Sequence, residues 1–234
     1  MPRKKIGWIR KQLGKVGKKL IRWRYRKIDL YVLSLMQLEV MKKYGELLGD
    51  QGQGFDLLDQ QFTQGAYDLF YSLMDYLKIF FSKALDDLPY LYDLALFVIL
   101  GNDYKTFFDT PQFISAEQSE DGIPKLVTRT KKCLLCASAD EGDIKVDELA
   151  HRGFAEILGN AVAALLQITQ DYVENDYQIV TKETKCFLRG DSYGEMVMYF
   201  HPKDKEEEGA KEETTEAVAE EKTDDTFTEN IDWE

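Results

Sequence analysis

Three cysteines and one histidine are the residues whose types could do chemistry together. They are Cys133, Cys136, Cys186 and His151. Sulfur and nitrogen donors of this kind bind zinc tetrahedrally, and a Cys-x-x-Cys turn supplies two of the four ligands. Cys133 and Cys136, however, lie in an apolar strand-like run, where residues three apart point to opposite faces. We therefore expect buried structural thiols, with a zinc site as the alternative. A redox role is less favoured, because the pattern does not place the pair at a helix N-terminus.

No nucleophile and general base can be paired, so we expect no catalytic residues, no cofactor and no enzymatic activity. The chain has two histidines, and both are expected on the surface. Residues 49–54 are rich in glycine but lack the Lys-Ser/Thr pair of a nucleotide-binding loop. The many carboxylates are expected to form a solvated face, and the tripeptide Arg189-Gly190-Asp191 a turn.

Charge divides the chain into three regions. Residues 1–27 carry 12 Lys or Arg and no acidic residue, whereas residues 203–234 carry 4 Lys and 14 Asp or Glu. The whole chain has a formal charge of -12, so the region between them is also acidic. We expect a basic amphipathic helix over 1–27, an α+β domain over 28–202 and a disordered acidic tail over 203–234.

The basic head is the strongest interaction signal in the sequence. Its apolar residues recur at spacings of three and four, so they form one stripe of a helix. Such a helix can lie on an anionic membrane surface. The expected membrane-binding residues are Lys4, Lys5, Trp8, Arg10, Lys11, Lys15, Lys18, Lys19, Arg22 and Trp23. Nucleic acid, which also attracts cations, is not expected as a partner because of the apolar stripe. Docking of the head on the acidic body is an alternative, and the acidic tail could also mask the head.

The odd number of cysteines and the absence of a secretory signal or a long apolar window predict a cytoplasmic protein with reduced thiols. Periodicity predicts helices over 28–48, 56–85, 89–101 and 147–173, separated by loops at 49–54 and 109–124. Alternating residues predict strands over 125–135, 177–188 and 193–200, the last two as an antiparallel hairpin. The fold class is therefore α+β, with long helices packed on a small antiparallel β-sheet.

The third region of interest is the aromatic helix expected over 56–85. We expect Phe62, Gly65, Tyr67, Phe70, Tyr71 and Phe80 to form an oligomer interface, because this helix is apolar over several faces. An apolar ligand pocket is the alternative use of the same residues.

Several segments resemble one family in order and spacing. Residues 58–69, with Gly65 in mid-helix, are similar to a helix of transport protein particle (TRAPP) core subunits, and residues 95–102 to that family's next helix. Residues 133–136 and 153–165 resemble its cysteine-bearing strand and small-residue helix. The residues that resemble the closing signature of the related 4-vinyl reductase domain are Glu183, Cys186, Gly190, Asp191 and Glu195.

This resemblance implies a TRAPP-core-like fold and a function in vesicle trafficking. It implies a non-enzymatic scaffold that tethers membranes, pairs with a related subunit or with itself, and has a small GTPase as a partner. The protein would then be cytoplasmic and peripheral to a membrane. The vinyl-reductase branch implies instead a sensor that binds a lipid or another apolar molecule. Residues 82–92 contain no cysteine for lipid acylation, and Gly194 stands where the second branch has a further cysteine.

Overall fold

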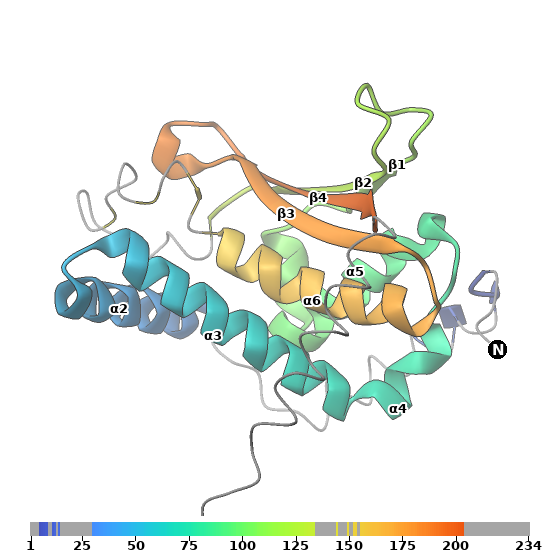
Figure 1. Ribbon diagram of the computed structural model, residues 1–234, viewed down its shortest axis with the longest axis horizontal. Helices are drawn as coiled ribbons and strands as arrows, with labels where there is room; N and C mark the ends of the chain where they lie inside the picture. Colours follow the sequence, from blue (N-terminus) through green and yellow to red (C-terminus); the bar gives the residue numbers. More distant parts are fainter. Residues whose placement is uncertain are drawn as a thin grey trace, which may run out of the picture. The chain divides into compact units, whose positions relative to one another are not determined.

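In the part of the chain that the structure describes, five helices and four antiparallel strands form the fold (Figure 1). The computed structural model describes residues 5–8, 11–12, 14, 30–133, 144, 149, 152–153 and 155–203. The acidic tail beyond Lys203 and most of the basic head lie outside these residues, so the predictions made for them stay predictions.

The described helices are α2 (Leu30–Leu48), α3 (Gln51–Ser72), α4 (Met74–Leu77), α5 (Leu88–Leu100) and α6 (Glu156–Tyr172). The strands are β1 (Gln112–Ile114), β2 (Lys125–Thr130), β3 (Tyr177–Lys185) and β4 (Gly194–Pro202), with 3-10 turns at Lys78–Phe80, Leu85–Asp87, Asn102–Thr106 and Phe187–Arg189. Strand order is β1-β2-β4-β3 and every pairing is antiparallel. The expected α+β class is confirmed, and β3 is an edge strand.

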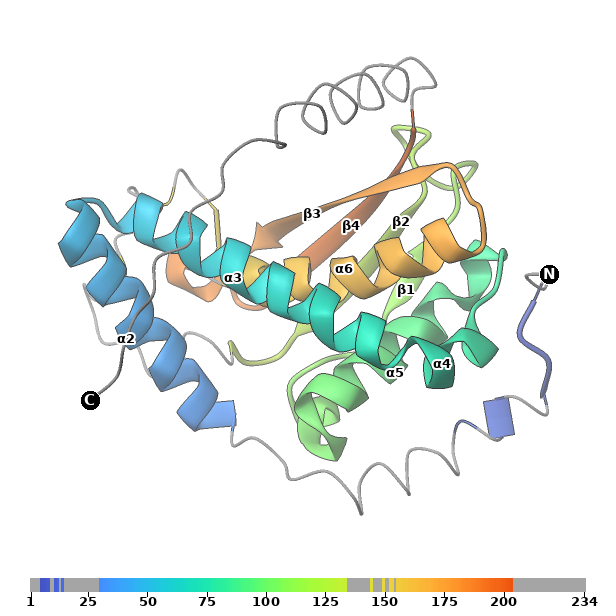
Figure 2. The same ribbon diagram turned by 60° about the horizontal axis from the view of Figure 1, so that its bottom comes forward.

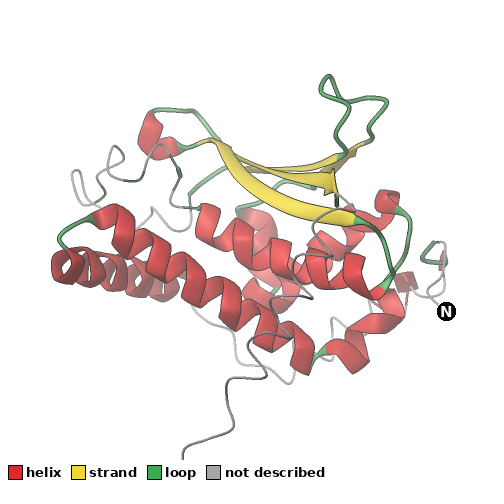
Figure 3. Ribbon diagram, viewed as in Figure 1, coloured by secondary structure: helices red, strands yellow, loops and turns green. Residues whose placement is uncertain are grey.

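The long helices lie on one side of the sheet, as Figures 2 and 3 show. Helix α6 packs directly against β3 and β4, α3 packs on α6, and α2 packs on α3. The inward residues of β4, such as Met198 and Phe200, meet fully buried residues of α6, such as Ile157 and Leu166. A side chain at Gly159 would overlap the Sδ atom of Met196, so a small residue is needed where α6 packs against β4.

The corner between α2 and α3 differs from the sequence prediction. Residues 49–54 were expected to form a loop, but α3 begins at Gln51. Asp50 caps this helix by accepting a hydrogen bond from the Gln53 amide at 2.8 Å. A Cβ at Gly54 would lie 2.7 Å from the Gly45 nitrogen, so glycine is needed for the backbones of α2 and α3 to cross here.

Two other helix boundaries also differ. The helix predicted over 56–85 ends at Ser72, because the Leu73 amide turns to share the carbonyls of Leu69 and Phe70 and a separate short helix follows. The helix predicted from 147 begins at Glu156. The predicted start and stop of α5 are confirmed by Pro89 in the first turn and Gly101 at the C-terminus, and the hairpin of β3 and β4 is confirmed.

Candidate functional site

The described part of the basic head packs against the start of α5. The Ile6 amide donates a 2.8 Å hydrogen bond to Asp87, and Lys11 pairs with the same carboxylate at 3.2 Å. Lys5 pairs with Asp86 at 3.3 Å, whereas the indole of Trp8 is 74% exposed. These residues therefore fit the interpretation that the head docks on the acidic body. The other predicted membrane-binding residues, Lys4, Arg10, Lys15, Lys18, Lys19, Arg22 and Trp23, lie outside the described residues.

The six residues expected to form an oligomer interface or apolar pocket are not on one surface. Phe70 and Phe80 are buried in the core, and Phe62 is half-buried. Tyr71 is 60% exposed and Gly65 is exposed on the same helix. Tyr67 is half-buried and lines a groove on the opposite side of α3 from the α2 contact. Phe70 and Phe80 are therefore core residues, and an interface at the other four stays a prediction.

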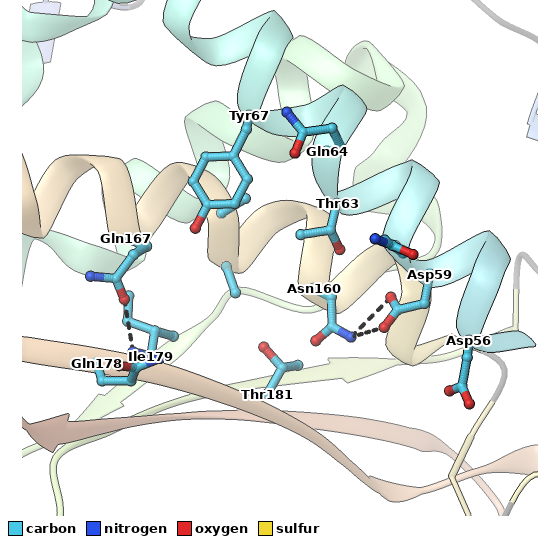
Figure 4. Close-up of a pocket in the computed structure, with 13 residues that line it drawn as sticks. Asp56, Asp59, Thr63, Gln64, Tyr67, Asn160, Gln167, Gln178, Ile179 and Thr181 are labelled. Carbon is cyan, nitrogen blue, oxygen red and sulfur yellow. Dashed lines mark hydrogen bonds between the residues drawn. The ribbon is translucent and has the colours of Figure 1, made fainter. Parts of the chain in front are cut away.

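A polar groove lies between α3, α6 and the edge strand β3 (Figure 4). Its volume is about 400 Å³, and most of its lining side chains are carboxylates, amides or hydroxyls. Asp59 on α3 accepts two hydrogen bonds from the Asn160 amide of α6, at 3.0 and 2.9 Å. Burial raises the pKa of Asp59, while the Asn160 amide and the charge of Arg152 lower it. The sequence analysis did not single out Asp59 or Asn160.

Polar side chains of α6 also bind the backbone of β3. The Gln167 amide donates to the Tyr177 carbonyl at 3.0 Å and accepts from the Ile179 amide at 2.9 Å. Glu156 accepts from the Glu183 amide at 3.3 Å. These contacts satisfy strand groups that have no neighbouring strand. The spacing of Glu156, Asn160 and Gln167 along a helix was the available sequence signal for this arrangement.

Glu183 and Cys186 form a buried pair next to the start of α6. Burial raises the pKa of Glu183 to about 7, while the Cys186 thiol and the charge of Arg189 lower it and the nearby Glu156 raises it further. Burial and the charge of Glu183 raise the pKa of the Cys186 thiol to about 11. A thiol with so high a pKa is a poor nucleophile. Most carboxylates were expected to form a solvated face, and Glu183 and Glu156, which are both buried, are exceptions to this.

Of the four residues considered as zinc ligands, the structure describes Cys133 and Cys186. Cys186 is a free, buried thiol, whereas Cys133 is disulfide-bonded, so the expectation of reduced thiols is wrong for Cys133. Cys136 and His151 lie outside the described residues, and the zinc alternative is not tested. Within the part of the chain that the structure describes, no three Cys, His, Asp or Glu side chains are placed to hold a metal ion.

An apolar stripe is exposed along α2. Its members are Val32, Met36, Val40, Leu47 and Leu48, which are 37–81% exposed. The opposite side of the helix carries Leu38 and Met41, both buried against α3. Residues 32, 36 and 40 follow one another at four-residue spacing, so they share one face. Nothing in the described residues covers this face.

In the described residues, no helix is both long enough and apolar enough to cross a membrane.

Comparison with known proteins does not assign the chain to a family. No family model matches the chain, and no curated protein matches it. Among solved structures, the chain is similar to the crystal structure of a trafficking protein particle complex subunit 3 from Naegleria fowleri covalently bound to palmitic acid. The two are 14% identical, with a TM-score of 0.43 over 72% of this chain and 97% of the other. A TM-score of this size is too low to carry an argument about function.

Proposed function

We propose that this protein is a non-enzymatic scaffold subunit of the TRAPP core type, which pairs through the exposed face of α2 with a related subunit or a second copy. The observation that carries the proposal is the apolar stripe on α2. Exposed apolar side chains that recur on one face of a helix, as Val32, Met36 and Val40 do, are typical of a surface that another protein covers. The resemblance to TRAPP core subunits implies pairing through helical faces, so we expect a related subunit or a second copy to cover this stripe.

Covering this stripe would contribute favourable free energy to a contact. Full burial of a Met or Leu side chain contributes about 1.5–3 kcal/mol. Met36 is 60% exposed and Leu47 is 81% exposed, so covering them would contribute about 1–2 kcal/mol each. The same face on a second copy would double this contribution in a symmetric dimer.

Sedimentation velocity of the full chain tests the pairing. We expect a dimer whose dissociation constant rises at least tenfold in Met36→Glu and in Val40→Glu, because each places a charge in the buried face. Val180→Glu is the matched control, since Val180 is 47% exposed on a strand outside α2. A monomer at all concentrations would leave only a heterologous subunit as partner. A dimer unaffected by both α2 changes would refute the proposed face.

The membrane part of the proposal concerns the basic head. Trp8 is exposed, and an indole at that position suits the interface between water and lipid. Lys5 and Lys11 already pair with Asp86 and Asp87, so other cations of residues 1–27 would have to supply the attraction. We expect binding to vesicles containing phosphatidylserine that weakens in Trp8→Ala and in high salt. Equal binding to neutral vesicles would contradict this attachment. A small GTPase is the further partner that the resemblance implies.

The alternative of an apolar-ligand sensor has less support. The groove beside β3 is lined by only three apolar residues, Ala163, Ala164 and Ile179. Native mass spectrometry separates the two functions, because a scaffold gives a dimer without added mass and a sensor gives a monomer with a bound small molecule.

A further inference from the structure

One row of backbone groups on the edge strand β3 does not pair with any strand of the described residues. In an antiparallel ladder, alternate residues direct both backbone groups toward the same neighbour. The Ile179 and Glu183 amides bind side chains of α6, so the odd-numbered residues of β3 face away from β4. The row that faces away from β4 therefore consists of the N–H and C=O groups of residues 177, 179, 181 and 183.

Helix α6 and a neighbouring turn satisfy both ends of this row. Gln167 binds Tyr177 and Ile179 at one end. At the other, Glu156 binds the Glu183 amide, and Arg189 donates to the Glu183 carbonyl at 2.9 Å.

The middle of the row is open. Within the described residues, the Ile179 carbonyl and the Thr181 amide and carbonyl have no hydrogen-bond partner, and neither has the Thr181 hydroxyl. Unpaired strand groups of this kind add a further strand readily.

The open stretch forms one wall of the polar groove. Figure 4 shows Thr181 and Ile179 on β3 facing Asp59, Thr63 and Tyr67 of α3, with Asn160 and Gln167 between them. The groove has a volume of about 400 Å³, within the range of binding clefts. Its position along the strand fits an extended chain better than a compact ligand.

The charge of the groove selects its occupant. None of its lining residues is Lys, Arg or His, whereas Asp56 and Asp59 are both present. Arg152 pairs with Asp56 at 2.6 Å. Asp59 contacts the neutral Asn160 amide, and no described cation lies within ion-pair distance of it. A positively charged side chain is therefore the natural complement of Asp59.

We propose that this groove binds an extended, basic peptide segment of a partner protein, which adds to the free edge of β3 at residues 179–181 and places a Lys or Arg side chain against Asp59. Backbone pairing with Ile179 and Thr181 supplies hydrogen bonds that do not depend on sequence, and Asp59 supplies the selectivity. The capping by Gln167 and Glu156 limits the pairing to about three residues of the strand. This site is separate from the α2 face, so its failure would leave the scaffold proposal standing.

Fluorescence anisotropy with defined peptides tests the proposal. The probe is a fluorescein-labelled hexapeptide of alternating Thr and Lys, and the comparison peptide replaces each Lys by Glu. Two further probes carry N-methyl groups on all Thr or on all Lys backbone amides. We expect the Thr-Lys peptide to bind more tightly than the Thr-Glu peptide by at least tenfold. One of the two N-methylated forms should lose binding, because only alternate amides of the peptide face β3.

Matched variants test whether Asp59 recognises the positive charge of the peptide. Asp59→Asn keeps an oxygen for Asn160 and is expected to weaken the Thr-Lys peptide about tenfold. Asp68→Asn makes the same charge change on the exposed surface of α3, outside the groove, and is expected to change binding less than twofold. The exchange rate of the Thr181 amide, followed by NMR, should fall about tenfold when the peptide is bound.

Four results would overturn the proposal. They are no binding of the Thr-Lys peptide up to millimolar concentration, equal binding of the Thr-Glu peptide, equal binding of both N-methylated forms, and protection of the Thr181 amide by self-association without peptide. The last of these would assign the edge to a second copy of the chain.

Discussion

Replacing Glu183 by Gln is expected to stabilise the protein by an amount that grows with pH. The carboxyl of Glu183 is 4% exposed, and burial raises its pKa from 4.5 to about 7. Glutamine has nearly the same shape and never ionises. The variant therefore removes the cost of keeping this carboxyl in the core without leaving a cavity.

The magnitude follows from the pKa difference between the two states. Between pH 4.5 and 7 the unfolded chain has released the Glu183 proton and the folded protein still holds it. Unfolding is then favoured by rising pH, so the wild type loses about 1.4 kcal/mol of unfolding free energy per pH unit in this interval. The stability that Glu183 contributes in its protonated form is fully present below pH 4.5, and its loss is complete above pH 7. The variant is thus expected to be more stable by about 1 kcal/mol at pH 5.5 and about 3 kcal/mol at pH 8.

Urea unfolding followed by circular dichroism measures this difference. Urea titrations of both proteins are run at pH 5.5, 6.5 and 8, which lie above the isoelectric point of about 4.8. The m-value should be the same at each pH. Glu120→Gln is the control, because Glu120 is exposed in the loop between β1 and β2. The control difference should not vary with pH. A gap between wild type and Glu183→Gln that stays constant from pH 5.5 to 8, or a less stable variant at pH 8, would refute the reasoning.

Four further substitutions test the packing and the hydrogen bonds. Gly54→Ala should lower the unfolding free energy in urea by about 1–3 kcal/mol, because the new Cβ meets the α2 backbone. Gly65→Ala should raise it by about 0.5–1 kcal/mol, because no atom lies within 4 Å of its new Cβ. Changes of the same sign in both variants would contradict the assigned contacts. Gln167→Ala should cost about 1–2 kcal/mol and speed hydrogen exchange of the β3 amides, and unchanged exchange would show that the amide does not cap this edge. Asp87→Asn should release the head and speed tryptic cleavage after Lys11 severalfold, while cleavage at the wild-type rate would show that Asp87 does not hold it.

Elements defined by local signals were predictable from the sequence. Helix α5 is bounded by Pro89 and Gly101, and the hairpin turns at Gly190, where φ is 85°. Proline and glycine at such positions act on the backbone directly, so tertiary packing has little to override.

Features set by distant contacts were not predictable. The glycines of residues 49–54 indicated a loop, yet Gly54 is required by a backbone crossing with α2 that no local pattern reveals. The start of α6 was placed too early, because Gly153 lies outside the helix against the Glu183 carboxylate, which comes from a strand thirty positions later. The burial of Glu183 was not predicted, since a single carboxylate in an alternating strand gives no sign of burial.

The groove could have been inferred from one pattern that the analysis of apolar residues passed over. Glu156, Asn160 and Gln167 lie at spacings of four and seven, so they share one side of a helix that is otherwise almost entirely buried. A polar row on such a helix must meet polar groups of its neighbours, because unpaired buried groups are costly. Here the partners are the Glu183 amide, the Asp59 carboxylate and the backbone of Tyr177 and Ile179.

The same row explains why a nine-residue edge strand can stay exposed in this fold. Natural sheets protect their edges against uncontrolled pairing, and α6 does so by binding β3 with side chains in place of a fifth strand. Asn160 breaks this protection, because it turns to Asp59 on α3 and leaves Thr181 without a partner from the described residues. Replacing Asn160 would therefore act on the Asp59 side of the groove alone. It would free the Asp59 carboxylate for a cation and leave the strand unchanged, so Asn160→Ala should bind the basic peptide more tightly while Asp59→Asn binds it more weakly. Opposite signs for these two variants can arise only if the groove recognises charge at Asp59.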